Sequence, residues 1–454
     1  MRHRNTTESK TKQQFTIMTA NKKSSGTKLL ILRIIVLAAI LTPVAVSVLG
    51  RARERKVQQR HDHQVDSVMQ TLSIREKVAQ LFMIEVSRFP SERTKAYQDS
   101  LIKEFGIGGI ILMRGPIGQF IERKNELQSA SAIPLLVSTD AEWGAAMRFQ
   151  EYRPYPRQAL LGRIEKGEKL LYRMGRNVGA ELRDLGIHMN LAPVADICPD
   201  PYNESDGQRS FGGDRELVAS YACAYMKGMQ DEGVFSCAKH YPGHGDTYVD
   251  SHYALPVLPF DRHRLDSLEF YPFKRLIDEG IESIMVAHLS IPAIDSTGVP
   301  MSISSKCMVD LLRGEQGFKG LIMTDAVGMK GVAEGRSAVE VNTLVYKAGS
   351  DLILMPDDVK ESICAIADSV ETGVWSEEEL NAKVRRVLEL KARAGLFDRD
   401  YNPIVDNLDE KISRAARRDS TLQVEISKAM ARSRKPPITP IGQDGTLVLD
   451  RAGK

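Results

Sequence analysis

Two stretches of the chain carry residues whose types and spacing could do chemistry. The first, residues 239–252, holds three histidines, two aspartates and a lysine among glycine and proline residues. Such a loop packs poorly but can direct polar side chains towards a common point. The second is the apolar run at residues 320–324, which leads directly into Asp325. A buried carboxylate is costly unless it is used or paired, so the two stretches together indicate an enzyme.

Asp325 is expected at the end of a buried strand, and a carboxylate there suits three tasks. It could attack a sugar carbon as a nucleophile, ligate a metal ion, or pair with an Arg or Lys side chain for structural reasons. Structural pairing is the ordinary interpretation of a lone Asp. It loses weight here because other expected strand ends also carry polar groups that enzymes use.

The loop at residues 239–252 allows three interpretations. Its imidazole and carboxylate groups could bind zinc or manganese; they belong to His240, His244, Asp246, Asp250 and His252. Pro242 and Gly243 exclude a helical His-x-x-x-His pair, however. Asp250 and His252 point the same way in an extended chain, so the carboxylate could orient the imidazole for acid–base work. A network that only stabilises the loop is the third possibility, and the residues favour the dyad.

A regular framework must position these residues, and residues 69–400 repeat one: a helix-period segment, a glycine and a short apolar strand. Each of five clear junctions has a glycine suited to the left-handed end of a helix, namely Gly106, Gly186, Gly233, Gly280 and Gly349. Further apolar runs at 78–86, 133–137 and 321–324 bring the number of strands to about eight. We expect an α/β fold, a (β/α)8 TIM-like barrel, with an open doubly wound sheet as the alternative.

Active sites of such barrels lie at the carboxyl ends of the strands, and polar residues occupy those ends here. In chain order they are Asp140, Asn190, Asp196, Lys239, His240, His288 and Asp325. Arg209 and Lys239 supply donors and Asp140 supplies an acceptor, which is the combination that hydroxyl-rich sugars require. Two residues stay open: Asp196 could only cap a turn, and Trp143 could stack on a sugar face or simply cover the barrel.

The distribution of charge argues against one class of partner. The whole chain has a net charge of +3, but residues 1–60 hold 13 Lys and Arg against two acidic residues and so contribute +11. The remainder therefore carries −8, and such an acidic body makes nucleic acid an unsuitable partner. Five scattered cysteines without a Cys-x-x-Cys pair argue against a structural zinc site or a disulfide framework.

The N-terminal region has the pattern of a targeting segment. Residues 29–50 form an apolar run broken only by Arg33 and preceded by lysines. The run fits a signal peptide or signal anchor, so we expect export to the periplasm or cell envelope, with membrane attachment through residues 29–50 if they are not cleaved. Three regions follow: the basic arm with this segment at 1–60, the barrel at 61–400, and a helical extension and tail at 401–454, with a helix at 412–431.

Residues 239–247 read Lys-His-Tyr-Pro-Gly-His-Gly-Asp-Thr, and residues 72–78 read Leu-Ser-Ile-Arg-Glu-Lys-Val. These motifs resemble glycoside hydrolase family 3, in particular its β-N-acetylglucosaminidases, and the resemblance extends to about Leu396. It implies a TIM-like barrel that removes terminal β-linked N-acetylglucosamine with retention through a covalent glycosyl-enzyme. The implied substrates are cell-wall-derived or chitin-type oligosaccharides, including muropeptides. The resemblance implies neither a metal nor a cofactor, and we expect a monomer.

The same resemblance assigns roles to individual residues. Asp325 corresponds to the nucleophile, His252 to the general acid/base and Asp250 to its dyad partner. The sugar-binding positions correspond to Asp140, Arg209, Lys239 and His240. The chain departs from the family in two respects: residues 140–144 read Asp-Ala-Glu-Trp-Gly where many bacterial relatives have Asp-Gln-Glu-Gly-Gly, and we expect the second, α/β sandwich domain of larger members to be absent.

The sequence leaves three alternative functions open. A β-glucosidase or β-xylosidase of the same family would share the barrel, but the loop dyad disfavours it. A non-catalytic sugar-binding protein of the envelope would have no need of Asp250, His252 and Asp325 together. A metal hydrolase would lose activity with a chelator.

Overall fold

The computed structural model describes residues 50, 52–86, 90–203, 207–247, 251, 254–433 and 435. Residues 1–64 and 65–454 are two separate compact units, and the second contains the barrel. Most of the predicted signal or anchor segment, residues 29–49, lies outside the described residues. In the described part of the chain, no helix combines the length and apolar character needed to cross a bilayer.

Eight parallel strands form one sheet in the order β7-β6-β5-β4-β3-β2-β1-β8. The strands are β1 (Phe82–Val86), β2 (Gly109–Leu112), β3 (Leu136–Thr139), β4 (Met189–Asn190), β5 (Phe235–Tyr241), β6 (Ser283–Val286), β7 (Leu321–Thr324) and β8 (Ile353–Leu354). A parallel bridge between Met323 and Leu352 joins β7 to the start of β8 and closes the ring. The predicted (β/α)8 barrel is confirmed, and the open doubly wound sheet is wrong because that sheet would have two unpaired edges.

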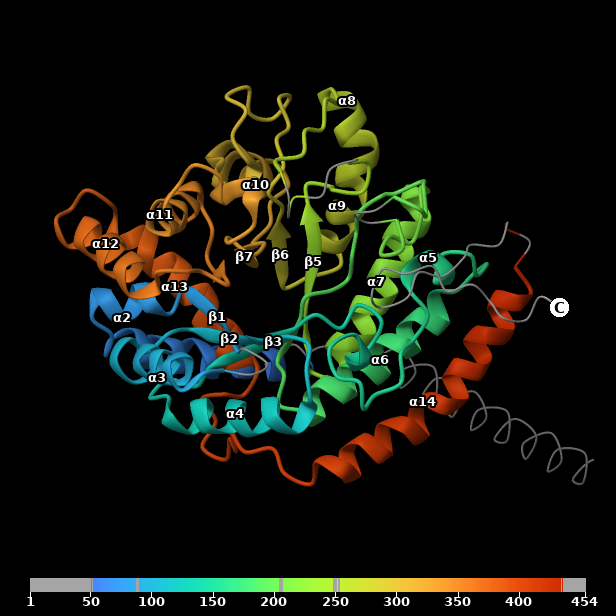
Figure 1. The fold of residues 1–454 in the computed structure, drawn as a ribbon, viewed down its shortest axis with the longest axis horizontal. Coiled ribbons are helices and arrows are strands. Elements are labelled where there is room, and N and C mark those ends of the chain that lie inside the picture. Colours follow the sequence, from blue (N-terminus) through green and yellow to red (C-terminus); the bar gives the residue numbers. More distant parts are fainter. Residues whose placement is uncertain are drawn as a thin grey trace, which may run out of the picture. The chain divides into compact units, whose positions relative to one another are not determined.

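Helices alternate with the strands along the chain and surround them (Figure 1). The longer helices are α2 (Ile74–Ala79), α3 (Glu92–Ser100), α4 (Ile117–Ala130), α6 (Glu168–Asp184), α7 (Arg215–Asp231), α9 (Phe270–Asp278), η5 (Lys306–Glu315), α11 (Ala338–Ala348), α12 (Val359–Glu371), α13 (Glu377–Arg393) and α14 (Leu408–Ala431). The shorter ones are η1 (Leu101–Phe105), η2 (Ala145–Met147), α5 (Gln158–Leu161), α8 (Arg262–Arg264), η3 (Leu265–Glu269), η4 (Met301–Ile303) and α10 (Lys330–Ala333).

Polar caps determine where several helices begin and so divide the apolar runs. Ser73 starts α2 through a reciprocal capping box with Glu76. Because this cap commits the following residues to a helix, Val78 lies in α2 and the strand begins only at Phe82, so the expected strand at 78–86 was too long. The strand expected at 133–137 likewise lies slightly later, at Leu136–Thr139.

Two glycines allow α6 and α7 to pack unusually close together. A Cβ atom on Gly175 would lie 2.2 Å from the carbonyl oxygen of Tyr225, and a Cβ on Gly228 would lie 2.1 Å from that of Tyr172. Any larger residue at either position would separate the helices. This contact fixes α6, whose residues stand behind the loop that follows β3.

The predicted helix at 412–431 is present as α14, which begins slightly earlier and lies along α6 (Figure 1). Charged side chains join the two helices: Arg173 Nη2 contacts Glu425 Oε1 at 3.0 Å, and Arg414 Nη2 contacts Asp184 Oδ2 at 3.0 Å. The region after the barrel therefore packs on it as part of the same unit.

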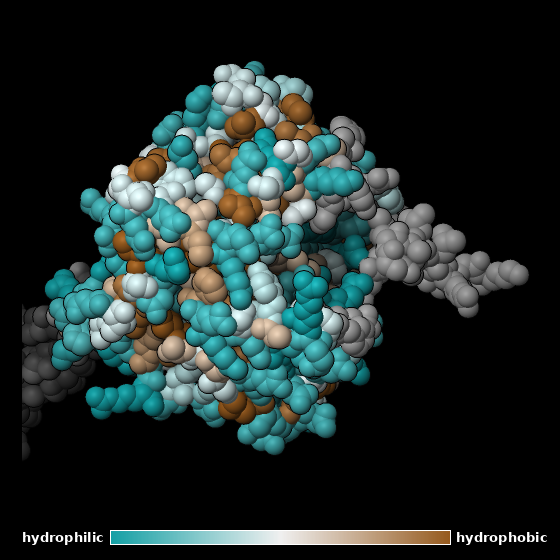
Figure 2. Space-filling model, turned by 60° about the vertical axis from the view of Figure 1, so that its left-hand side comes forward, coloured by the Kyte–Doolittle hydropathy of each residue, from teal (hydrophilic) through white to brown (hydrophobic). Residues whose placement is uncertain are grey.

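Hydrophilic residues predominate on the face shown in Figure 2, and hydrophobic residues are scattered over it in small groups. The exposed large apolar side chains of the barrel unit come from separate parts of the chain: Tyr97, Tyr202, Val257, Val309, Val374, Ile404 and Val424. No broad apolar docking face is visible in this view.

Candidate active site

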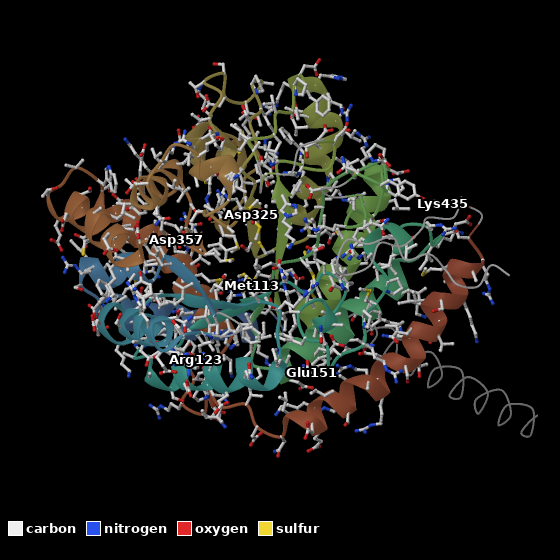
Figure 3. The ribbon with its side chains drawn as sticks, in the orientation of Figure 1. Met113, Arg123, Glu151, Asp325, Asp357 and Lys435 are labelled. Atoms are coloured by element: carbon white, nitrogen blue, oxygen red, sulfur yellow. The ribbon has the colours of Figure 1, made fainter. Side chains whose placement is uncertain are left out.

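The carboxyl ends of the strands surround a cavity of about 200 Å³. Its polar lining consists of Asp140, Glu142, Arg148, Arg209, Lys239, His240, His244, Ser251 and Asp325. Its apolar lining comes mainly from Ile111, Met113, Leu191, Met285, Leu354 and Met355. Asp325 and Met113 lie near the middle of the ring of strands in Figure 3. The structure thus brings five predicted site residues into one cavity.

Asp325 follows β7 directly, as expected, and hydrogen bonds hold both its backbone and its side chain. Its N–H donates to the carbonyl oxygen of Val286 at 3.0 Å, and its Oδ1 accepts the N–H of Ala326 at 2.8 Å. Burial raises the pKa of the Asp325 carboxyl, but nearby His240 and His288, together with the Ala326 N–H, outweigh burial and hold the pKa below its ordinary value of 3.8. Asp325 is therefore an anion at neutral pH, as a nucleophile must be.

Asp140, at the end of β3, is held between two cations. Lys239 Nζ donates to its Oδ1 at 2.6 Å, and Arg148 donates to its Oδ2. Burial raises the pKa of the Asp140 carboxyl, yet Lys239 and Arg148 together depress it far below its ordinary value. The carboxylate is fixed in position and charged, which suits an acceptor for sugar hydroxyl groups.

Glu142 is a member of the site that the sequence did not identify. It has no exposed surface, and it contacts Lys239 Nζ at 2.8 Å and Arg209 Nη2 at 2.7 Å. Burial opposes its ionisation, but Arg209 and Lys239 lower its pKa to about 2. Its spacing was a usable signal, because residues i and i+2 of an extended segment share a face and Glu142 follows Asp140 at that interval. Nothing in the sequence marks Arg148.

Asp196 resolves one of the open alternatives, because it anchors the histidine loop. Its Oδ1 accepts the backbone N–H of His244 at 2.7 Å, and its Oδ2 lies 2.7 Å from His240 Nδ1. Arg209 Nη2 lies 3.2 Å from the other ring nitrogen of His240. A guanidinium can only donate, so this geometry places the ring proton on Nδ1, facing Asp196. Asp196 therefore orients the His240 ring and does not cap its own turn.

His288, the predicted residue at the end of β6, supports the loop that carries the nucleophile. Its Nε2 lies 3.0 Å from the carbonyl oxygen of Ala326, and its Nδ1 lies 2.6 Å from Ser302 Oγ. Since a carbonyl accepts only, Nε2 carries the proton and Nδ1 accepts from the serine. Burial lowers the pKa of His288, although Asp325 and the Ala326 backbone oppose the shift. His288 acts through the backbone beside Asp325 and does not line the cavity.

Trp143 is not among the residues that line the cavity. Its side chain is almost fully buried, and the Arg157 guanidinium lies over the ring at 4.6 Å from the ring centre. The backbone around it is pinned, because the N–H of Tyr155 donates to the Trp143 carbonyl at 3.0 Å. Of the two uses that the sequence left open, the geometry favours covering the barrel over stacking on a sugar.

The expected dyad, Asp250 and His252, lies outside the described residues. Its neighbour Ser251 lines the cavity, and the Ser251 carbonyl accepts the N–H of Gly331 at 3.0 Å. Within the described ranges, no group of three or more His, Cys, Asp or Glu side chains is placed to hold a metal ion. All five cysteines are described, and none forms a disulfide.

A closed parallel barrel with a carboxylate-lined cavity at the carboxyl ends of its strands is the architecture of a TIM-barrel enzyme. Residues 73–390 match the family model described as the glycosyl hydrolase family 3 N terminal domain. The chain belongs to glycosyl hydrolase family 3, which confirms the resemblance found in its sequence.

Individual relatives point to one branch of this family. The chain is 32% identical to β-hexosaminidase A of Pseudoalteromonas piscicida over 64% of its own length, but spans only 54% of that relative. It is 33% identical to a β-hexosaminidase of Methylobacillus flagellatus, with 56% of this chain and 76% of the relative covered. The structure of a family 3 β-N-acetylglucosaminidase from Paenibacillus sp. matches with a TM-score of 0.70 and 35% identity, covering 79% of this chain and 69% of that one. These names agree with the hexosaminidase hydrolase that the sequence implied.

Proposed function

We propose that the chain is a retaining β-N-acetylhexosaminidase that removes terminal β-linked N-acetylglucosamine from oligosaccharides. The observation that carries the proposal is the position of Asp325, an ionised carboxylate at the end of β7, in the same cavity as the Asp140–Lys239–Glu142 network. The network offers fixed charged donors and acceptors to hydroxyl groups, and the nucleophile lies beside it.

The reaction proceeds in two steps. Asp325 attacks the anomeric carbon while the bond to the leaving oxygen breaks, and His252 transfers its proton to that oxygen. In the second step His252 takes a proton from water, the water oxygen bonds to the anomeric carbon, and the ester bond to Asp325 breaks. Two inversions leave the sugar in its original β configuration. Asp250 would orient the histidine and raise its proton affinity.

The biological setting is part of the same proposal. Oligosaccharides and muropeptides from cell walls, or chitin-type fragments, supply the terminal sugar that the mechanism requires. A signal peptide or anchor at residues 29–50 would place the protein in the periplasm or cell envelope, where such fragments occur. The acidic body of the chain argues against a nucleic-acid partner.

The decisive assay compares hydrolysis of an aryl β-N-acetylglucosaminide with that of an aryl β-glucoside, each with and without EDTA. We expect release from the acetamido sugar alone, unaffected by the chelator, because the proposed steps use only Asp325, His252 and water. Equal or faster cleavage of the glucoside would transfer the assignment to a β-glucosidase. Activity lost in EDTA would favour the metal hydrolase, and a folded but inactive chain would favour a sugar-binding protein.

The dyad is tested separately by Asp250→Ala. We expect kcat to fall by roughly 10²-fold, the lower end of what general acid–base catalysis contributes. Loss of the carboxylate lowers the pKa of the histidine, so the alkaline limb of the pH–rate profile should move to lower pH. Asp246→Asn, in the same loop and bonded to Arg264, serves as the matched control. An unchanged pH profile in Asp250→Ala would contradict the dyad.

A further inference from the structure

The loop that follows β3 carries Asp140 and Glu142, and its backbone is fixed at nearly every residue. Asn190 holds Ala141 from both sides, at 2.9 Å through Oδ1 and at 3.1 Å through Nδ2. Gln158 donates to the Glu142 carbonyl at 2.9 Å. The last of these contacts comes from α6, where Glu181 Oε2 accepts the N–H of Ala145 at 3.0 Å. The shape of the loop therefore depends on a glutamate that never reaches the cavity.

Glu181 lies within hydrogen-bonding reach of a second carboxyl group, Asp419 of α14, and both side chains are almost entirely buried. Asp419 Oδ1 accepts the hydroxyl of Tyr155 at 2.9 Å. Each carboxyl keeps one buried oxygen, Glu181 Oε1 and Asp419 Oδ2, for which no N–H or hydroxyl donor lies in reach among the described residues. A proton held between the two groups would supply the missing donor and would remove the repulsion between two buried carboxylates.

The surroundings of the pair contain few compensating charges. Tyr152 and Tyr155 approach from the chain before α5, Tyr225 from α7 and Asp184 from α6. Arg418 of α14 is the nearby cation, with its Nε 3.9 Å from Asp419 Oδ1. Burial, followed by the hydrogen bond and the charge of Asp419, raises the pKa of Glu181 well above its ordinary 4.5. A single guanidinium does not balance two carboxylates, so these surroundings favour the protonated form of Glu181.

We propose that the carboxyl pair of Glu181 and Asp419, shared between α6 and α14, positions the β3 loop and thereby presents Asp140 and Glu142 to the sugar. Neither residue touches substrate; both act through the Ala145 backbone and Tyr155. Helix α14 then helps to position the active-site loop. The proposal also makes the loop sensitive to pH, because removal of the shared proton forces two carboxylates apart in a dry environment.

The ionisation of Glu181 changes the stability of the folded chain in a definite direction as pH rises. The pKa of Glu181 is raised in the folded chain, so the stability that its protonated form provides is complete below about pH 4.5 and is lost as pH rises towards the raised pKa. Glu181→Gln carries an amide that donates to Asp419 at every pH and still accepts the Ala145 N–H. The melting temperature of Glu181→Gln should therefore exceed that of the unchanged chain by an amount that grows as pH rises above about 4.5.

Fluorescence reads the loop directly and does not require activity. The chain has two tryptophans, and Trp143 lies in this loop whereas Trp375 packs against Tyr346 elsewhere. In the full chain carrying Trp375→Phe, the emission of Trp143 should shift as pH rises above about 4.5, with one midpoint set by Glu181. Adding Glu181→Gln should abolish the shift. Adding Asp419→Asn should move the midpoint to lower pH, because a neighbouring negative charge is removed.

Steady-state kinetics supply a second test of the positioning role, and this test rests on the proposed hydrolysis of the sugar. We expect Glu181→Ala to raise KM for an aryl β-N-acetylglucosaminide by about tenfold, because the sugar-binding carboxylates are displaced. Glu181→Gln should restore KM to within about twofold of the original value. Glu425→Gln, which removes a surface ion pair between the same two helices, controls for general loosening of α14 and should leave KM unchanged.

The outcomes separate the two proposals. If the unchanged chain hydrolyses no sugar, the proposed function fails, and the Trp143 titration still decides the role of the pair. A pH-dependent emission that disappears in Glu181→Gln supports the pair. An emission that is flat in a folded chain, or the same transition in Glu181→Gln, overturns it. In an active chain, a KM unchanged by Glu181→Ala overturns the positioning role.

Discussion

Replacing Asp325 with asparagine is expected to abolish turnover, with a loss of at least about 10⁴-fold in kcat, while the chain remains folded. An amide cannot form the ester to the anomeric carbon, so the first chemical step has no nucleophile. The fold should tolerate the change, since an asparagine Oδ1 can still accept the Ala326 N–H that Asp325 accepts at 2.8 Å. Steady-state rates together with melting temperature test both statements.

Two further variants separate loss of the nucleophile from a general disturbance of the site. Asp325→Gly leaves space beside the anomeric carbon, so added azide should restore turnover and give the α-glycosyl azide, the product of a single inversion. Asp357→Asn removes a carboxylate that follows β8 in the chain and does not line the cavity, and it should retain full activity. A β-configured azide product, or equal losses in Asp325→Asn and Asp357→Asn, would contradict the assignment.

The depressed pKa of Asp325 also predicts how activity depends on pH. The group is ionised at every pH above its ordinary value of 3.8, so the nucleophile does not limit activity between mildly acidic and neutral conditions. A limb of the pH–rate profile in that range must come from another group, and the histidine of the dyad is the natural source. This is why the Asp250→Ala profile discriminates between interpretations of the histidine loop.

The fold could be predicted from the sequence because its signals are local. A helix-period segment, a glycine and a short apolar run recur along the chain, and each strand end is visible as the point where a polar residue interrupts the apolar run. The limits of the strands were less accurate. Ser73 commits the residues after it to α2, and a hydrophobic run alone does not reveal that a cap has divided it between helix and strand.

The site was only partly predictable, for a physical reason. Residues at strand ends could be named because the barrel brings those ends together, and Asp140, Lys239, His240 and Asp325 do share a cavity. The ion pairs among them depend on three-dimensional distances that spacing does not encode. Arg148 and Glu142 complete the network around Lys239, and only Glu142 had a spacing that could have identified it.

The buried network also constrains the charged side chains that line the cavity. Lys239 is almost fully buried between Asp140 and Glu142, and an isolated buried charge would be far more costly than a paired one. Such a network adds little net stability compared with apolar packing, but it fixes donors and acceptors before substrate arrives. The network therefore contributes more to the preorganisation of the sugar-binding groups than to the stability of the fold.

Asp140→Asn is the second substitution with a large expected effect, a loss on the order of 10³-fold in kcat/KM. A hydrogen bond to a charged group contributes about 1.5–3 kcal/mol, and we expect the carboxylate to accept from two sugar hydroxyls. The fold should survive, because Lys239 keeps Glu142 as a partner at 2.8 Å. Kinetics on the aryl N-acetylglucosaminide, with melting temperature alongside, measure both effects.

Two explanations for such a loss must be separated, since Asp140 also holds Lys239 and Arg148. If the carboxylate binds a sugar hydroxyl itself, a substrate that lacks this hydroxyl should have a much lower kcat/KM with the unchanged enzyme. With the Asp140→Asn enzyme, the same substrate should lower kcat/KM only slightly. The 3-deoxy, 4-deoxy and 6-deoxy substrates, assayed against both enzymes, form a set of double-mutant cycles. A coupling of about 1 kcal/mol or more at one hydroxyl identifies the contact. Equal losses for every deoxy sugar in both enzymes would mean that Asp140 only orders the cations, and that Lys239, Arg148 and Arg209 carry the recognition.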